Sequence, residues 1–338
     1  MSKPAKDGKA SIVALSRSDG RGDPVARGAA RYYSPVSPLS GVIMSPVSPR
    51  YMAFPVLAVL IWSINMVVAK MAAGVISPAV IGFYRWVIAL ALLAPFVAPG
   101  LRREWSQIRR HLWQLAVLGA LGMAVFQGFS YVAAATTTAT NMGIIASTVP
   151  LMTIAVGALL LRERPTLMAV LGALLALFGL SILIGEGDPA RLLEVGGSLG
   201  DGLMALAALS YALYGVLLRK WRLPIGVWQS LFMQAAFALL YHLPFFLWSS
   251  PSSLNLQNLP LVLYAGIFPS LFAPYLWMQG VRYLGPNRAS IFLNLMPVCT
   301  VIIAALTLGE HPHSYHVVGG LLALAGVSIA QFRPRAAA

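Results

Sequence analysis

Two glutamates and two prolines recur at one fixed distance in this apolar chain. Glu163 precedes Glu310 by 147 positions, and Pro150 precedes Pro297 by the same 147, inside segments that align without a gap. Because each is a minority residue in an apolar segment, the shared spacing indicates an internal duplication. These residues provide two kinds of chemistry. The glutamates place a carboxylate at the end of an apolar segment, and the prolines interrupt backbone hydrogen bonding inside an apolar segment.

The two prolines predict a break in the middle of each apolar helix that contains them. A proline inside a helix removes one hydrogen bond and clashes with the preceding turn, so the carbonyl oxygens of Ala146 and Leu293 lose their donors. In hydrocarbon such oxygens must be paired again or must line a cavity. Ser147, Thr148 and Asn294 lie close enough along the chain to pair with them. A hinge beside a cavity and a packing kink are the two interpretations.

Arg85 lies about two turns inside an apolar segment, where a buried cation is costly. No Asp or Glu occurs in the middle of any apolar segment. Hydroxyl groups, carbonyl groups or an anionic group on a substrate must therefore serve as its partner. Two roles stay open, structural anchoring and substrate contact. Lys70, at the end of its own segment, is expected to anchor that end at the membrane interface.

A set of polar or amphipathic side chains lies within the apolar segments or at their ends. They are Trp62, Asn65, Tyr131, Asn141, Tyr211, Tyr214, Tyr275, Trp277 and Asn294. An amide in lipid needs a partner, and amides between aromatic walls favour a cavity for a zwitterionic or aromatic solute. Four tryptophans are instead expected in the interfacial aromatic belt. These are Trp86, Trp113, Trp228 and Trp248.

The titratable residues are candidates for gating or for carrying a coupling proton. Glu163 and Glu310 could pair with arginine, cap the helix that follows, or gate a path. Asp201 and His242 are the other candidates for a coupling proton, although a histidine inside an apolar segment is expected to be a packed core residue.

Three histidines beside Glu310 resemble a metal cluster, namely His311, His313 and His316. We expect them to be solvated histidines of a short loop, and we expect neither a metal site nor a cofactor. The single cysteine, Cys299, excludes a disulfide within one chain.

The composition places these residues in a membrane. The chain has 338 residues, of which 58% are hydrophobic and 10% are charged, with a mean hydropathy of +0.76. A soluble domain has about 25% charged residues, so the chain is a polytopic membrane protein. Its net charge of +14 comes from basic residues in short clusters between apolar segments. Such clusters direct membrane topology, and no nucleic-acid partner is expected.

Ten apolar segments, each of roughly 17 to 23 residues, are long enough to cross a bilayer core as helices. They lie near residues 52–72, 79–98, 113–133, 138–160, 166–185, 200–219, 226–248, 259–281, 287–308 and 314–332. Basic residues concentrate in every second connection, which puts both termini in the cytoplasm. Five segments per repeat is an odd number, so the halves have opposite orientations. The sequence predicts an all-α membrane protein of ten transmembrane helices, built as two five-helix inverted-topology repeats.

The predicted organisation has five parts. They are a disordered basic Ser/Pro-rich tail (1–50), a first repeat (51–185), a periplasmic linker (186–199), a second repeat (200–332) and a cytoplasmic tail (333–338). Met44, which opens Met-Ser-Pro-Val-Ser-Pro-Arg just before the first apolar segment, is the expected start of the protein.

The order and spacing of short motifs resemble one family. The first half carries Trp62-Ser63, Asn65, Lys70, Phe83-Tyr84-Arg85, Asn141, Pro150 and Leu160-Leu161-Arg162-Glu163, and the second half carries Gly200-Asp201, Tyr211-Ala212, Asn294, Pro297 and Leu308-Gly309-Glu310. Over about residues 52–332 the chain resembles the drug/metabolite transporter superfamily, specifically its proteins with two EamA domains. Tyr211 departs from the common Trp, and Arg162 from the usual small residue. The resemblance implies a ten-helix bacterial inner-membrane carrier, usually an exporter of amino acids, other small metabolites or drugs.

We therefore expect a secondary-active exporter of an amino acid or amino-acid-derived compound, metallophores included, that works by alternating access. A channel-like or facilitative permease for drugs, nucleosides or other small polar solutes is the alternative. No catalytic constellation is visible, so an enzyme is not expected. The expected partners are the lipid bilayer and a small-molecule substrate, while a homodimer and a coupling proton stay open. Substrate choice is expected where the halves differ, at Arg85 against Gln234 and at Asn65 against Tyr214.

Overall fold

The computed structural model describes residues 49–162, 165–188, 199–249, 254–284, 289 and 292–331, and in these ranges every regular element is helical. The all-α prediction is therefore confirmed. Eight helices of the described chain are long and apolar enough to cross a membrane, and two shorter apolar helices complete the predicted ten. Most of the predicted tail, including Met44, lies outside the described residues.

The first five membrane segments begin close to the predicted positions. Their elements are η1 (Pro49–Met52), α2 (Ala53–Ala72), α3 (Pro78–Arg110), α4 (Leu112–Gly119), η2 (Ala120–Val125), α5 (Phe126–Ala133), α6 (Ala139–Ala146), α7 (Val149–Leu161) and α8 (Leu167–Ile184). Threonine hydroxyls cap two of these helices: Thr138 accepts from the Asn141 amide, and Thr166 from the Ala169 amide.

The second half repeats this plan. Its elements are α9 (Leu199–Trp221), α10 (Val227–Trp248), α11 (Leu259–Ile267), η4 (Phe268–Phe272), α12 (Ala273–Leu284), η5 (Phe292–Leu295), α14 (Met296–Leu308) and α15 (Ser314–Gln331). The third segment of each half contains a π-helix in its middle, η2 in the first half and η4 in the second. Short π-helices inside α-helices often mark functional positions.

The structure interrupts the α-helix just before each of the two prolines, and the geometry differs from the expected kink. α6 ends at Ala146 and α7 begins at Val149, so Pro150 lies in the first turn of a new helix, where its missing N–H needs no acceptor. Pro297 occupies the same place in α14. Ser147 and Thr148 do not pair with Ala146. Their hydroxyls instead donate to the carbonyl oxygens three residues earlier, at 2.6 and 2.7 Å.

α3 is longer than the sequence predicts. The predicted segment ended at residue 98, but the helix continues to Arg110 and contains Pro95 and Pro99. The final turns are amphipathic, because Ile108 is fully buried while Arg109 and Arg110 are exposed. A helix with one apolar and one charged face can persist at a membrane surface, and the connection predicted as a loop is therefore helical.

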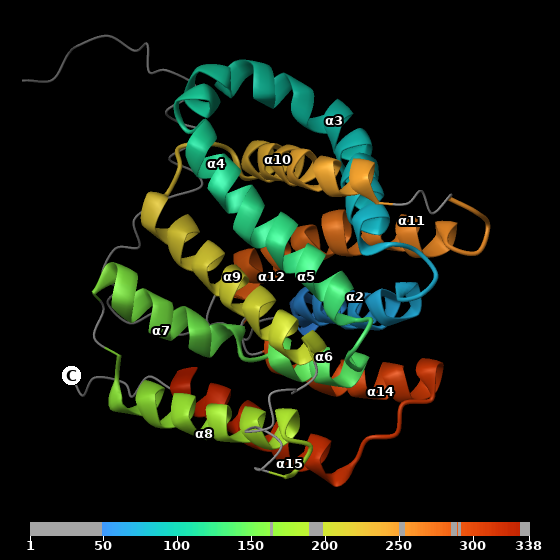
Figure 1. Cartoon of the computed structure of the whole chain (residues 1–338). Coiled ribbons are helices and arrows are strands. Elements are labelled where there is room, and N and C mark those ends of the chain that lie inside the picture. The colour runs from blue at the N-terminus through green and yellow to red at the C-terminus, as the bar shows by residue number, and fades with distance from the viewer. Residues whose placement is uncertain are drawn as a thin grey trace, which may run out of the picture. The chain divides into compact units, whose positions relative to one another are not determined.

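The two halves interlock. α2 packs on α12 and α14 of the second half, and α9 packs on α5 and α7 of the first half (Figure 1). Helices at corresponding positions also pair directly, α3 with α10 and α8 with α15. Each half therefore completes the packing of the other.

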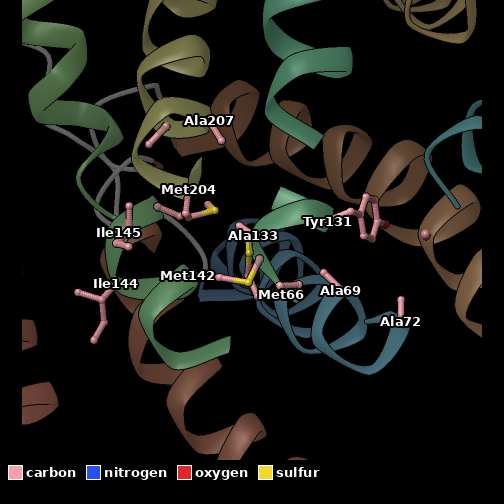
Figure 2. Close-up of a cluster of buried hydrophobic side chains, with 14 of the residues drawn as sticks. Met66, Ala69, Ala72, Tyr131, Ala133, Met142, Ile144, Ile145, Met204 and Ala207 are labelled. Carbon is pink, nitrogen blue, oxygen red and sulfur yellow. The ribbon is translucent and has the colours of Figure 1, made fainter. Parts of the chain in front are cut away.

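The main apolar core lies where α2, α5, α6 and α9 meet (Figure 2). Its members include Met66, Ala69, Ala72, Tyr131, Ala133, Met142, Ile144, Ile145, Met204 and Ala207. Many of these side chains are small, which lets membrane helices approach closely. Because α9 belongs to the second half, this core is shared between the repeats.

The tryptophans expected in an interfacial belt do not all face outward. The exposed fractions of Trp113 and Trp248 are 59% and 94%, whereas Trp86 is only 4% exposed. Trp86 packs against Met123 and Ala235, so the expectation of an interfacial position is wrong for this residue. Its ring also contacts a buried guanidinium, which explains why it is held inside.

α8 and α15 meet backbone to backbone through paired glycines. A Cβ atom added at Gly172 would lie 2.4 Å from the carbonyl oxygen of Gly326, and one added at Gly326 would lie 2.4 Å from that of Gly172. Gly179 and Gly319 have the same reciprocal relation, at 2.6 and 2.7 Å. No side chain fits without separating the helices.

We expect Gly172→Ala to lower the melting temperature of the purified protein, because overpacking costs about 1–3 kcal/mol. Gly202→Ala is the matched control, since nothing lies within 4 Å of a Cβ atom there and alanine favours the helix by up to ~1 kcal/mol. Thermal unfolding in detergent, followed by tryptophan fluorescence, measures both variants. Equal melting temperatures for the two would contradict the packing described.

Candidate functional site

Arg85 occupies a polar centre inside the helix bundle. Its side chain is 1% exposed. Nη1 donates to Gln127 Oε1 at 2.7 Å and to the Tyr131 hydroxyl at 3.1 Å, while Nε and Nη2 donate to Ser270 Oγ at 3.3 and 2.9 Å. Gln127 and Tyr131 lie on α5, and Ser270 lies on η4 of the second half. The guanidinium therefore points inward and joins the two repeats.

These neutral partners satisfy Arg85 without neutralising its charge. The ion pair found among the described residues is a surface contact between Arg103 and Glu104, and no carboxylate there pairs with Arg85. The rings of Trp86 and Tyr131 lie 5.0 and 5.7 Å from its Cζ atom, which gives favourable cation–π contacts. The hydrogen bonds described use four of the five guanidinium N–H groups. The remaining Nη2 hydrogen and the unbalanced charge suit an additional anionic acceptor.

His242 packs beside this centre from α10. Its Nδ1 bonds the Ala238 carbonyl oxygen at 2.8 Å, and the side chain is 6% exposed. A Cβ atom added at Gly82 would lie 2.9 Å from its Nε2, and one added at Gly128 would lie 3.6 Å away. The imidazole thus fills space that the glycines of α3 and α5 leave, as expected for a packed core histidine.

Two corresponding aromatic contacts lie where the halves cross. On α9, the rings of Tyr211 and Tyr214 are 5.3 Å apart, and Phe126 of α5 lies 4.8 Å from Tyr211. On α2, Trp62 lies 5.6 Å from Trp277 of α12. Four of the predicted cavity residues are therefore placed as two aromatic groups, one at each crossing.

The three predicted amides have different surroundings. Asn65 is 5% exposed, and its Oδ1 is buried without a hydrogen-bond partner among the described residues. Asn141 is also buried and bonds a carboxylate described below. Asn294 is half-buried and donates to Ser328 Oγ at 3.3 Å. It therefore does not replace the hydrogen bond that the Leu293 carbonyl oxygen was predicted to lose.

Tyr275 lies apart from the other predicted cavity residues. It is 42% exposed and stacks on Trp228 at 6.1 Å, in a shallow apolar groove that also contains Phe96. Arg85 and Tyr131 are thus brought into direct contact, whereas Tyr275, Asn141 and Asn294 lie outside that centre.

A second polar centre surrounds the turn between α5 and α6, residues 134–138, and the first turn of α6. Lys70 Nζ donates to the carbonyl oxygens of Ala134 and Thr137, at 3.0 and 2.7 Å. The end of α5 carries partial negative charge, which favours a cation there. Lys70 therefore holds a helix end inside the protein instead of only anchoring its own helix at the interface.

Glu310 caps the helix that begins on the other side of this turn. Its Oε1 accepts from the Ala139 amide at 2.9 Å, and its Oε2 accepts from the Thr140 amide at 3.1 Å and the Thr140 hydroxyl at 2.7 Å. Glu310 therefore caps a helix, as the capping interpretation predicts, but that helix is α6 of the first half and not the helix that follows Glu310. Glu163, the equivalent glutamate of the first repeat, lies outside the described residues.

Asp201 makes the third contact with the turn, from the first turn of α9. It accepts a hydrogen bond from the Thr137 hydroxyl and bonds from Asn141 Nδ2 at 3.2 and 3.3 Å. The side chain is 3% exposed. A carboxylate in the first turn of a helix is also favoured by the helix dipole. Asp201 and Glu310 thus attach the second half to a turn of the first.

The histidines near Glu310 do not form a metal centre in the part of the chain that the structure describes, which has no group of three suitable ligands. His311 and His313 are exposed. His316 is 7% exposed, and its Nδ1 accepts from the His313 amide at 2.9 Å. The expectation of a solvated loop residue is therefore wrong for His316.

Sequence reasoning missed the neutral residues of both centres, Gln127, Ser270 and Thr137. One signal for Gln127 was present, because it lies four positions before Tyr131 and so shares a helix face with it. Ser270 could not be found in this way, since its π-helix changes which side chains face the bundle.

The comparisons with known proteins agree with this architecture. The family model described as "EamA-like transporter family" matches residues 50–185 and 198–331. The uncharacterized transporter YyaM of Bacillus subtilis is 28% identical over 77% of this chain and 86% of its own length. A protein of Streptantibioticus cattleyicolor named "Probable terminal-alkyne amino-acid exporter" is 23% identical over 81% of this chain and 91% of its own length.

A solved crystal structure, whose description gives no function, has the same fold with a TM-score of 0.55. It is 22% identical and covers 83% of this chain and 96% of its own. Two matched segments, ten apolar helices and interlocked halves lead to one conclusion: this chain belongs to the EamA-like transporter family of the drug/metabolite transporter superfamily.

Proposed function

We propose that this protein is a secondary transporter that exports a small carboxylate-bearing metabolite, an amino acid or an amino-acid-derived compound, by alternating access. The observation that carries the proposal is the Arg85 centre. It is a buried cation whose protein partners in the described chain are all neutral, at a contact between the two repeats. A buried charge without a counter-charge is unfavourable by several kcal/mol, and a substrate carboxylate would supply that counter-charge.

The arrangement of the helices supports alternating access. Arg85 is held by α5 of its own half and by η4 of the other half, so relative movement of the halves would change its surroundings. The π-helices and the breaks before α7 and α14 supply places where helices can bend. Repeats of opposite orientation commonly move against each other around a site near the middle of the membrane.

The substrate class is further supported by a relative. The Streptantibioticus cattleyicolor protein is named as a probable exporter of an amino acid, and an amino acid carries the carboxylate that Arg85 suits. The aromatic groups near Tyr211 and Trp62 would favour a solute with an apolar or aromatic part.

We further propose a location in the bacterial inner membrane with both termini in the cytoplasm. The exposed basic end of α3 would then face the cytoplasm, as would Arg219 and Lys220 at the end of α9. The α5–α6 turn with Lys70, Asp201 and Glu310 would lie on the outer side.

The function is tested by comparing the extracellular metabolites of a wild-type strain with those of a strain that lacks the gene. A carboxylate-bearing compound should decrease in the medium of the deletion strain and return on complementation. An unchanged medium under conditions in which the gene is expressed would contradict export.

The facilitative alternative is separated from secondary transport by flux into proteoliposomes. A carrier that exposes its site to one side at a time gives a flux that saturates with solute concentration. A flux that rises without saturation, or single-channel currents, would favour a channel-like permease.

Arg85→Gln should reduce flux of the exported compound about tenfold or more, because a hydrogen bond to a charged group contributes about 1.5–3 kcal/mol. Arg109→Gln is the matched control, since it removes the same charge from an exposed site on the same helix. Flux into proteoliposomes and thermal unfolding are measured together. Loss of flux in a variant that still unfolds near the wild-type temperature supports substrate contact, whereas unchanged flux would refute it.

Asn65→Leu should lower flux while leaving the melting temperature unchanged or raised. Its Oδ1 has no partner among the described residues, and removing an unsatisfied buried polar group does not destabilise a protein. Asn141→Leu is the contrast, because it breaks the bonds to Asp201 and should lower the melting temperature. If Asn65→Leu unfolds as early as Asn141→Leu, Asn65 has a structural role and not a substrate-binding one.

A further inference from the structure

The α5–α6 turn is the place where the second half is attached to the first by ionisable groups. Asp201 bonds Thr137 and Asn141, and Glu310 caps α6 at Ala139 and Thr140. Any movement that separates α9 from α5 on this side of the membrane must break the Asp201 contacts. We call the contact of Asp201 with Thr137 and Asn141 the Asp201 junction.

The corresponding junction at the opposite end of the molecule has different chemistry. There the start of α2 meets the end of α12, as the start of α9 meets the end of α5. Tyr51 stacks on Tyr283 at 4.4 Å, and Phe54 lies 5.8 Å from the same ring. Among the described residues, a buried carboxylate lies at one of these two equivalent places and stacked aromatic rings lie at the other. Mild acid changes the charge of a carboxylate but not of tyrosine or phenylalanine.

Asp201 and Glu310 have different hydrogen-bond donors. Glu310 accepts three hydrogen bonds, two of them from amides at the start of α6. Asp201 is held by a neutral hydroxyl and a neutral amide side chain and is 3% exposed. Asp201 is therefore the carboxylate of this region whose hydrogen-bond donors are all side chains.

From this geometry we propose that the Asp201 junction is a proton-operated outer gate. Ionised Asp201 holds α9 against the α5–α6 turn, and a proton taken from water on the outer side releases it. The inference rests on the proposed transport function and orientation, and it assigns the coupling proton to Asp201.

The physical basis is the strength of hydrogen bonds to a charged acceptor. Bonds to a carboxylate are roughly twice as strong as bonds between neutral groups. Protonation leaves Thr137 and Asn141 as donors facing a neutral carboxyl group, and the attachment of α9 weakens.

Among the described residues, the charged groups near Asp201 lie on or after three helices. Lys70 holds the same turn from the end of α2, Glu310 follows α14, and Glu186, which follows α8, acts electrostatically on Asp201. Lys70 bonds carbonyl oxygens of the turn and leaves Asp201 to the neutral donors.

The test measures the accessibility of a buried position in the full-length protein without substrate. Met204 is fully buried on α9, one turn from Asp201, and its Sδ contacts Ser130 of α5 at 3.5 Å. In a Cys299→Ser background, Met204→Cys reports opening through its rate of reaction with a membrane-impermeant maleimide. The protein is reconstituted in liposomes, and molecules with the outer side exposed are measured. A cysteine on a surface loop of the same protein corrects for the effect of pH on thiol reactivity.

The corrected labelling rate should rise about tenfold as the outer solution changes from neutral to acidic, as expected for weakening a charge-assisted bond. With Asp201→Asn added, which mimics the protonated acid, the rate should be high and independent of pH. Thr137→Val, which removes one donor and keeps the shape, should raise the rate at neutral pH. Glu310→Gln is the matched control and should keep the wild-type pH response.

A rate that does not respond to pH, or the same response with Asp201→Asn, would overturn the assignment. A response that disappears with Glu310→Gln and persists with Asp201→Asn would also overturn it, in favour of Glu310. Because no substrate is present, these outcomes are independent of the export experiment. Failure of the gate test with intact export would leave the transport function standing.

Discussion

Every backbone N–H and C=O group of this protein that faces hydrocarbon must find its partner within the protein, and the rest of the structure follows from that constraint. It makes each segment helical and restricts interruptions to places where other groups take over. Before α7, the hydroxyls of Ser147 and Thr148 pair with carbonyl oxygens at the end of α6. At the α5–α6 turn, Lys70 bonds a carbonyl oxygen at the end of α5, and Glu310 accepts from an amide at the start of α6. The irregular positions are thus positions where polar side chains pair with the backbone.

Much of the architecture could be predicted because it depends on local properties of the sequence. The lengths of the apolar segments predicted the ten helices, and the shared spacing of Pro150 and Pro297 predicted the positions of the breaks. The contacts of the sites could not be predicted, because they depend on how distant helices cross. Glu310 was expected to cap the helix after it, yet it caps α6, some 170 residues earlier in the chain. Ser270, which bonds Arg85, lies in a π-helix of the other half, and an α-helical pattern does not predict where its side chain points.

The two polar centres show how the two halves of an inverted repeat can differ in their side chains while they share one backbone plan. The backbone plan is the same in both halves, down to the π-helix in each third segment. The side chains at equivalent places differ, with Arg85 bound to three neutral partners while Gln234 bonds Ser230 on its own helix. The proposed alternating access would use the backbone symmetry for its two states, and the side-chain differences would then set the solute and the side of the membrane that each state serves.

The interlocking of the halves has a consequence for how the protein is made. α2 is synthesised before the helices it packs against, α12 and α14, which belong to the second half. The first five helices must therefore wait in the bilayer with unfilled contact surfaces until the second half is inserted. During that interval α2 presents to lipid the surfaces that α12 and α14 later cover, and the completed bundle can form only after the second repeat has been translated as far as α14.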